Sequence, residues 1–341
     1  MYTCQKLQVK WGASVSDAFH VVNGVKQGGV ISPILFSVYV DDLLVNLENL
    51  GIGCFLGSRY VGALAYADDI TLVCPTISGL RKMIQVCESY AYNYNILFNG
   101  SKSQLLLFKG RNCKEIKSNI FVNGSLVNFI NSAVHLGHHI SCIDKDIAIS
   151  HAIGQFWKSF NLLMSDFGHV HSFILCKLFR QYCCSYYGAP LWDLSSTAFN
   201  NLCVAWRKAL RVLWKVDYTT HCNIIEWLSG GIPIHAHLEM RFIKFTKTYL
   251  TSENSILKSV AALCTSNPMS IAGNNLKNVI YENGDVMNDI NIIRSRHKMS
   301  YCDENLIFTI RELINIRDGN FVCDTLSCDD VNDILKCLCT N

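Results

Sequence analysis

The sequence predicts an α+β fold, in which antiparallel strands with packed helices are followed by a mainly helical region. Up to residue 142, apolar and polar residues alternate in short runs punctuated by glycine and asparagine, which is typical of strands and turns with two helices. Between residues 145 and 250, apolar residues recur at every third or fourth position, the period of an α-helix. We therefore expect three regions, at 1–145, 146–250 and 251–341, the last a polar extension.

Composition excludes several classes of protein. Of the 341 residues, 50% are apolar and 17% are charged, so the chain can build hydrophobic cores. The mean hydropathy is +0.20, but the longest uncharged apolar run, at 28–40, is shorter than the roughly 20 residues of a membrane-spanning helix. No signal-peptide pattern is visible, and the 17 scattered cysteines include no Cys-x-x-Cys. We expect an intracellular protein, nuclear or cytoplasmic, with reduced thiols and no membrane partner.

A loop and a helix start form the first motif. The expected helix covers 33–50, with Ser32 as its N-cap and a proline in its first turn. Before it, Gly28 and Gly29 allow the backbone to approach a ligand closely, and the Gln27 amide can bond a base or a backbone group. An ordinary joint between a strand and a helix explains the same residues equally well.

Two adjacent carboxylates mark the second motif. The apolar runs on either side of residues 66–69 (Tyr-Ala-Asp-Asp) predict a β-hairpin with Asp68 and Asp69 at its tip. Burying two acids beside apolar strands is costly, and a divalent cation such as Mg²⁺ would remove much of that cost. The alternative is a solvated turn. The second such pair, Asp41 and Asp42, falls on the expected helix, where the two side chains diverge by about 100°.

Two further turns follow. An amphipathic helix is expected over 78–94, and Lys102 comes in the turn before the next strand, where a surface lysine is the plain alternative. The Asn-Gly pair at 123–124 predicts a hairpin, and Leu136 and Gly137 come after it.

The middle of the chain is basic. Residues 145–250 contain 11 basic and 6 acidic side chains, whereas residues 251–341 contain 8 basic and 12 acidic ones. A helix expected over 202–215 turns four apolar side chains inward: Leu202, Trp206, Leu210 and Leu213. Its other face carries Arg207, Lys208, Arg211 and Lys215. These side chains either contact a nucleic-acid phosphate backbone or form a solvated basic face.

A zinc site is not expected. His135, His138, His139 and Cys142 are close in the sequence, but on a strand His138 and His139 point to opposite faces. The acidic residues near the C-terminus, from 318 to 333, lack the spacing of a calcium-binding loop.

Together, four of these motifs resemble consecutive motifs of reverse transcriptases. They are residues 24–33, 66–69, 99–103 and 136–137, in the right order, with 41, 34 and 34 residues separating Gln27, Asp68, Lys102 and Leu136. The amino-acid sequence around Tyr39 is similar to that of non-LTR (LINE-type, jockey- or CR1-like) retrotransposon polymerases. The fold implied is part of a polymerase palm over 1–145, followed by a thumb-like helical region.

The resemblance also implies roles for residues in template-directed nucleotidyl transfer by two Mg²⁺ ions. Asp68 and Asp69 match the metal-binding catalytic pair, with Asp68 the more important ligand, and Lys102 matches a catalytic lysine near the leaving pyrophosphate. Residues implied to lie near the incoming nucleotide and the template are Gln27, Gly28, Gly29 and Tyr66. Leu136 and Gly137 match a primer grip. The implied partners are an RNA template, a DNA primer and deoxynucleoside triphosphates.

One element of the family pattern is not found. The two-metal site needs a further aspartate from an earlier strand, and the only acid before Gln27 is Asp17, ten residues away, which is too close to serve. The template-holding fingers of the family are not recognised either. We therefore expect an N-terminally truncated polymerase fragment that is inactive alone. The alternatives are a nucleic-acid-binding remnant without catalysis, or a relic with no function.

Overall fold

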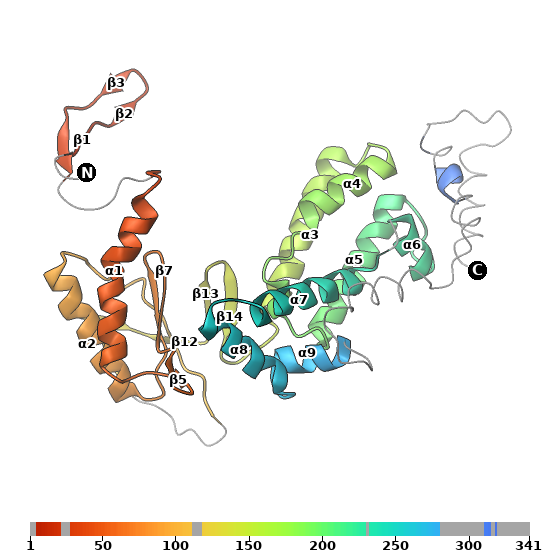
Figure 1. The fold of residues 1–341 in the computed structure, drawn as a ribbon. Coiled ribbons are helices and arrows are strands. Elements are labelled where there is room, and N and C mark those ends of the chain that lie inside the picture. Colours follow the sequence, from red (N-terminus) through yellow and green to blue (C-terminus); the bar gives the residue numbers. More distant parts are fainter. Residues whose placement is uncertain are drawn as a thin grey trace. The chain divides into compact units, whose positions relative to one another are not determined.

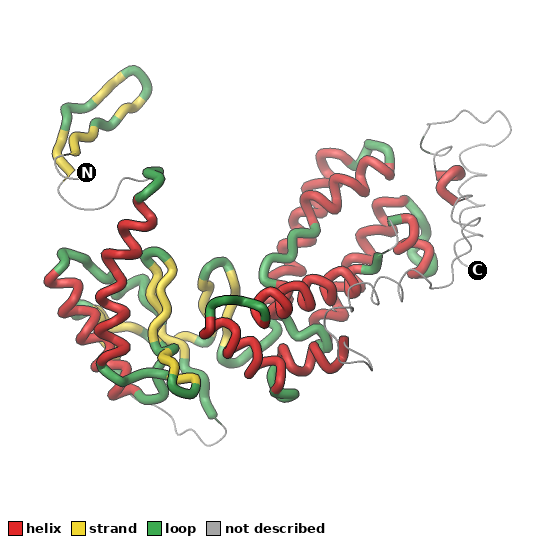
Figure 2. The backbone as a smooth tube through the Cα atoms, viewed as in Figure 1, coloured by secondary structure: helices red, strands yellow, loops and turns green. Residues whose placement is uncertain are grey.

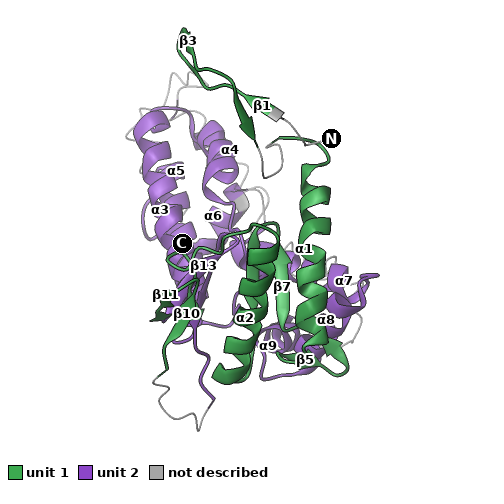
Figure 3. Cartoon of the chain, turned by 90° about the vertical axis from the view of Figure 1, so that its left-hand side faces the viewer, with its two compact units in different colours: residues 1–105, 111–129 green, residues 106–110, 130–341 purple. Residues whose placement is uncertain are grey.

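The computed structural model describes residues 5–21, 28–110, 118–229, 232–279, 310–314 and 318 (Figure 1). The chain divides into two compact units, residues 1–105 with 111–129, and residues 106–110 with 130–341 (Figure 3). Short strands and two helices make up the first unit, and helices dominate the second (Figure 2). The predicted α+β class is confirmed, while the division at residues 145 and 250 stays a prediction about domains. No described helix is both long and apolar enough to cross a membrane.

The strands of the first unit are short and pair antiparallel in twos. The pairs are β1 (Gln5–Leu7) with β4 (Phe19–Val21), β2 (Lys10–Trp11) with β3 (Ser14–Val15), β5 (Phe55–Leu56) with β6 (Arg59–Tyr60), β7 (Ala63–Tyr66) with β8 (Asp69–Leu72), and β10 (Ile120–Val122) with β11 (Ser125–Val127). Two more short strands are β9 (Leu105–Leu106) and β12 (Phe129–Ile130). The Asn-Gly hairpin is confirmed: φ is +49° at Asn123 and +74° at Gly124, as a type I′ turn requires.

Two helices form the core of the first unit. They are α1 (Ser32–Asn49) and α2 (Ile77–Asn93), both within a residue or so of the predicted bounds. Leu47 of α1 and Met83 of α2 are fully buried and belong to the same hydrophobic cluster. The prediction of Ser32 as the N-cap is wrong: α1 begins at Ser32 itself, which is buried, and no side chain caps this end.

The second unit begins with one hairpin and continues as helices. Its elements are β13 (Ser132–His135), β14 (His138–Ser141), α3 (Ile147–Phe167), α4 (Ser172–Cys183), a 3₁₀ turn (Ala189–Leu191), α5 (Thr197–Trp214), α6 (Cys222–Leu228), α7 (Ile234–Leu250), α8 (Ser255–Ser266) and α9 (Ile271–Val279). Helix α5 is central, since Leu202, Leu210 and Trp214 are all fully buried. The predicted inward face of this helix is confirmed.

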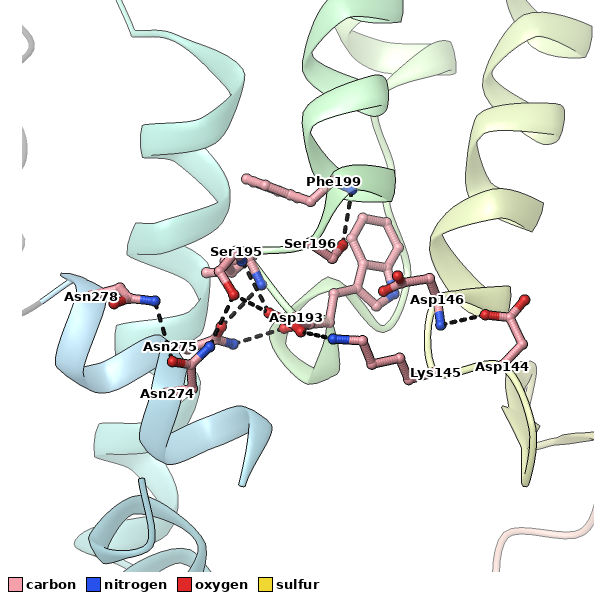
Figure 4. A network of polar contacts seen from close by, with 12 residues as sticks. Asp144, Lys145, Asp146, Asp193, Ser195, Ser196, Phe199, Asn274, Asn275 and Asn278 are labelled. Atoms are coloured by element: carbon pink, nitrogen blue, oxygen red, sulfur yellow. Dashed lines mark hydrogen bonds and ion pairs between the residues drawn. The ribbon is translucent and has the colours of Figure 1, made fainter. Parts of the chain in front are cut away.

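A polar network ties three separate segments of the second unit together (Figure 4). Asp193, before α5, is buried; its carboxylate accepts a 2.6 Å hydrogen bond from Lys145 Nζ, before α3, and others from Ser195. Asn275 of α9 accepts from the Leu194 amide at 2.9 Å. Burial would raise the pKa of Asp193, but the hydrogen bonds from Lys145 and Ser195 outweigh it and hold the pKa below its usual value. The network therefore fixes the start of α3 and helix α9 to the chain around Asp193.

Candidate active site

The Tyr-Ala-Asp-Asp sequence forms the tip of the β7–β8 hairpin, as predicted. Tyr66 pairs with Asp69, which leaves Ala67 and Asp68 as a two-residue loop. Of these two residues, only Ala67 has a positive φ, +52°. A residue with a Cβ adopts this left-handed conformation at a cost of about 1–2 kcal/mol. The hairpin thus stores backbone strain directly beside Asp68.

Both carboxylates lie on the solvent side of the hairpin. Ile70 and Leu72 of β8 pack against the α1–α2 core, and because side chains alternate along a strand, Asp69 and Tyr66 lie on the opposite face. Asp68 and Asp69 are exposed, and Tyr66 is 66% exposed. Of the two interpretations of the pair, buried or solvated, the structure shows the solvated one, because Asp68 lies in the two-residue loop and Asp69 lies on the strand face opposite the core. Both carboxylates are open to a ligand.

The donor chemistry of the hairpin fits part of a divalent-cation site. Adjacent carboxylates provide the hard oxygen ligands that Mg²⁺ binds in one- or two-carboxylate sites with substrate phosphates. Among the described residues, no three His, Cys, Asp or Glu side chains come together closely enough to hold a metal ion. Asp17, which is exposed between β3 and β4, is not part of such a group, and neither are the histidines of β13 and β14. Asp68 and Asp69 thus supply two carboxylates with no third acid beside them in the described chain.

The second acidic pair behaves as the sequence predicts. Asp41 and Asp42 lie on α1, and both are exposed. The Asp42 carboxylate accepts a hydrogen bond of 3.4 Å from the hydroxyl of Tyr94, whose ring stacks on Tyr90 at the end of α2. This pair is a polar helix face that helps to hold α1 to α2. It provides a matched control for the hairpin pair.

Lys102 is presented by a tight turn in the first unit. The Asn99 side-chain oxygen accepts hydrogen bonds from the Lys102 amide at 3.1 Å and from the Ser101 hydroxyl at 2.7 Å. Gly100 in this turn packs so closely that an added Cβ would lie 2.5 Å from the Val122 carbonyl oxygen, so only glycine fits. The Lys102 side chain is exposed, and in the part of the chain that the structure describes it forms no ion pair with Asp68 or Asp69.

The loop before α1 is described only at its end. Gln27 lies outside the described residues. Gly28 is exposed with φ of +79°, and the Gly29 carbonyl accepts a hydrogen bond from the Ser32 amide at 3.2 Å. The two glycines therefore lead directly into the first turn of the helix, as the sequence predicts.

The predicted primer-grip residues form the tip of the β13–β14 hairpin in the second unit. His135 pairs with His138, and the two loop residues, Leu136 and Gly137, have φ of +49° and +75°. Glycine adopts this conformation freely, whereas leucine does not. The Tyr187 hydroxyl, from the segment after α4, donates a 3.0 Å hydrogen bond to the Leu136 carbonyl and so supports the strained turn.

Two cations of the basic face of α5 have partners within the second unit. Arg207 lies 3.8 Å from Glu226, a residue of α6 whose pKa is raised by burial, against the lowering effect of Arg207. Arg211 donates through Nε at 3.2 Å and through Nη2 at 2.8 Å to the Thr220 carbonyl, in the loop between α5 and α6. These side chains stabilise the α5–α6 connection, a role that the sequence analysis did not predict.

A third cation of this face meets an acid from far along the chain. Lys215, at the C-terminal end of α5, lies 3.7 Å from Asp318. The other oxygen of Asp318 accepts from the Ser172 amide at 3.1 Å and the Ser172 hydroxyl at 2.7 Å, at the start of α4. Lys208, by contrast, is exposed. The four basic residues thus divide into three with partners in the fold and one that faces solvent.

The sequence analysis assigned no structural role to three residues of these contacts: Tyr187, Glu226 and Asp318. Each acts through a partner distant in sequence, up to 146 residues away for Asp318 and Ser172. No local motif marks such residues, and only the second Tyr of the 186–187 pair, followed by a glycine, offers a weak turn signal.

A comparison with protein families matches residues 3–145 to "Reverse transcriptase (RNA-dependent DNA polymerase)". The match covers less than half of the chain, and the hairpin with Asp68 and Asp69 lies within the matched segment. Members of this family depend on divalent metal ions and act on nucleic acid and nucleotides.

Similar curated proteins indicate which kind of reverse transcriptase the matched segment resembles. The chain is 32% identical over 113 residues to the "Retrovirus-related Pol polyprotein from type-2 retrotransposable element R2DM" of Drosophila melanogaster, covering 32% of this chain and 11% of that protein. Polyproteins of type-1 retrotransposable element R2 match at 39% over 67 residues in Nasonia vitripennis and 45% over 51 in Popillia japonica. These matches cover 19% and 15% of this chain, and 6% and 7% of those proteins. These similarities support a reverse transcriptase domain of a non-LTR retrotransposon in the matched segment, whereas a jockey- or CR1-like subtype stays a prediction.

Proposed function

We propose that this chain is part of an RNA-directed DNA polymerase and supplies the Asp68–Asp69 carboxylates to a Mg²⁺-dependent nucleotidyl-transfer site. The observation that carries the proposal is the strained β7–β8 tip, which presents two exposed carboxylates within the segment that matches the family. The substrates are an RNA template, a DNA primer and deoxynucleoside triphosphates. The chain spans about a tenth or less of the length of the curated relatives it matches.

Each residue of the site has a proposed task. Asp68 and Asp69 hold the metal ions, which, when bound, stabilise the attacking and leaving oxygens of an in-line displacement. Tyr66 lies beside Asp69 on the open face of the hairpin and provides a surface for the nucleotide. Lys102 screens or protonates the leaving pyrophosphate.

Residues in loops and turns are proposed to bind the nucleotide, the template and the primer. Gln27, Gly28 and Gly29 approach the nucleotide and the template. Leu136 and Gly137 support the primer strand.

We further propose that the remaining acidic ligand comes from a segment that is not among the described residues. A two-metal site would need a further acidic ligand, and among the described residues no third acid lies beside Asp68 and Asp69. Without a segment that holds the template and the nucleotide, much of the roughly 7–11 kcal/mol that proximity contributes to such reactions would also be lost.

Primer extension tests this proposal. The 341-residue chain with Mg²⁺ or Mn²⁺ is expected not to extend a primer on an RNA template. Adding the polymerase segment of an R2 relative that precedes the matched region is expected to restore extension. Extension by the chain alone, abolished in Asp68→Asn, would contradict the need for a further segment and would direct attention to Asp17.

A nucleic-acid-binding remnant is the second candidate, and the basic region of the second unit favours it. Of the four basic residues on α5, Lys208 is the exposed one, and we expect it to contact phosphate, while Arg211 serves the fold.

Two single substitutions separate these roles. Lys208→Gln is expected to reduce the salt slope of single-stranded RNA binding by about 0.7, the value of one phosphate contact, and to leave stability within about 0.5 kcal/mol. Arg211→Gln is expected to lower the free energy of unfolding by about 1–3 kcal/mol, because it leaves the Thr220 carbonyl without its charged donor. Salt titrations of RNA binding measure the first effect, and urea denaturation measures the second. An unchanged salt slope in Lys208→Gln would mean that Lys208 makes no phosphate contact.

A further inference from the structure

A small pocket in the second unit is not used by the proposed catalytic site. It has a cavity volume of about 190 Å³ and lies among the β13–β14 hairpin, helix α3 and the end of α4 with the segment after it. One wall is His138 and His139, which follow the Leu136–Gly137 turn, and the wall from α3 includes Gln155 and Ser159. The cavity is smaller than the roughly 300–1,000 Å³ of a drug-sized site, so it suits a single ring system.

The pocket carries no formal charge. Its lining contains no lysine, arginine, aspartate or glutamate. Burial lowers the pKa of His138, and the neighbouring His139 lowers it further; burial and then His151 lower the pKa of His139. Both shifts favour the neutral form of the imidazole. A lining without lysine, arginine or acidic side chains favours an uncharged ligand group over a phosphate.

The polar and aromatic groups of the pocket are those that recognise a planar heterocycle. Gln155 and Ser159 can both donate and accept hydrogen bonds at its edge. Tyr182 and Tyr187 also line the pocket, and each is 67% exposed, so each ring has a face open to a stacking partner. His139 and His151, both in the lining, already pack ring against ring, with centroids 3.9 Å apart and the planes tilted by 35°.

We propose that this pocket binds one unpaired nucleobase, which stacks on Tyr182 and hydrogen-bonds to Gln155 and Ser159. The inference rests on the proposed function, because it takes nucleic acid as the ligand. The Tyr187 hydroxyl also supports the Leu136 carbonyl, so occupancy of the pocket and the shape of the adjacent hairpin are linked through one side chain.

Uncharged nucleosides provide the direct test, since they bind without help from a phosphate backbone. Saturation-transfer NMR of the full chain with adenosine, guanosine, cytidine and thymidine is expected to show binding of at least one. The matching 5′-monophosphate is expected to bind no more tightly, because the pocket holds no cation. Tyr182→Ala is expected to weaken nucleoside binding about 5- to 150-fold, the range for loss of one stacking ring.

Two tyrosine variants serve as controls for the loss of nucleoside binding. Tyr218→Ala removes another exposed tyrosine of the same unit, outside the pocket, and is expected to leave binding unchanged. Tyr187→Phe keeps the ring and removes the hydroxyl, and is expected to retain nucleoside binding.

The outcomes separate the pocket from the proposed function. Absence of nucleoside binding at millimolar concentration, or equal binding by Tyr182→Ala, overturns the pocket whatever the chain does with RNA. Nucleoside binding that depends on Tyr182, together with no binding of single-stranded RNA, supports the pocket and counts against the polymerase proposal.

Discussion

Asp68→Asn is expected to lower the rate of primer extension by at least about a hundredfold, in the chain complemented with its preceding segment. Metal-ion stabilisation of the displaced oxygens contributes several kcal/mol, and each 1.36 kcal/mol changes the rate tenfold. Asparagine keeps the shape of the side chain but removes the charge that holds the cation. Because Asp68 is exposed in a two-residue loop, the substitution leaves the fold intact, which circular dichroism checks.

Asp41→Asn is the matched control for this loss. It removes a charge from the other Asp-Asp pair, on the exposed face of α1, and is expected to change the rate by less than about twofold. The rate of primer extension in Asp69→Asn is expected to lie between those of Asp68→Asn and Asp41→Asn, since Asp68 is the more important ligand in our proposal. Equal rates for Asp68→Asn and the unmodified chain would remove the hairpin from the catalytic site.

Leu210→Ala is expected to have the largest effect on stability, a loss of about 2.7–5.0 kcal/mol in the free energy of unfolding of the second unit. Leu210 lies on α5 and is fully buried, so its truncation loses the transfer free energy of the side chain and leaves a cavity. Tryptophan fluorescence during urea denaturation measures the change, because five of the six tryptophans belong to the second unit.

Leu162→Ala, on α3, makes the same chemical change at a side chain that is 63% exposed. It is expected to alter the unfolding free energy by no more than about 0.5 kcal/mol. A loss of similar size in both variants would mean that α5 is not the centre of the core.

The sequence predicts the elements whose cause is local. Proline in its first turn, the apolar period and the glycine at 51 define α1, and the Asn-Gly pair defines the β10–β11 turn through its two positive φ angles. The Asp68–Asp69 tip follows from the apolar runs on either side of it. In each case a few neighbouring residues contain the whole explanation.

What the sequence could not show depends on distant partners. The basic face of α5 suggested phosphate contacts, yet Arg207 and Arg211 contact Glu226 and the Thr220 carbonyl, because helix α6 folds back beside α5. The sequence also left open whether Asp68 is buried or solvated, since alternation along a strand does not say how far a hairpin extends beyond its core. The roles proposed for Lys102 and Leu136 came from family resemblance alone.

The contact between Asp318 and the start of α4 also has a consequence for synthesis on the ribosome. Lys215 and Ser172 emerge early, but the carboxylate that bonds them is made about 100 residues after Lys215. At about 5–20 residues per second, translation of that interval takes roughly 5–20 seconds. During that time the Ser172 amide and hydroxyl lack the Asp318 carboxylate and are hydrated instead. Completion of the second unit is therefore late in the life of the nascent chain.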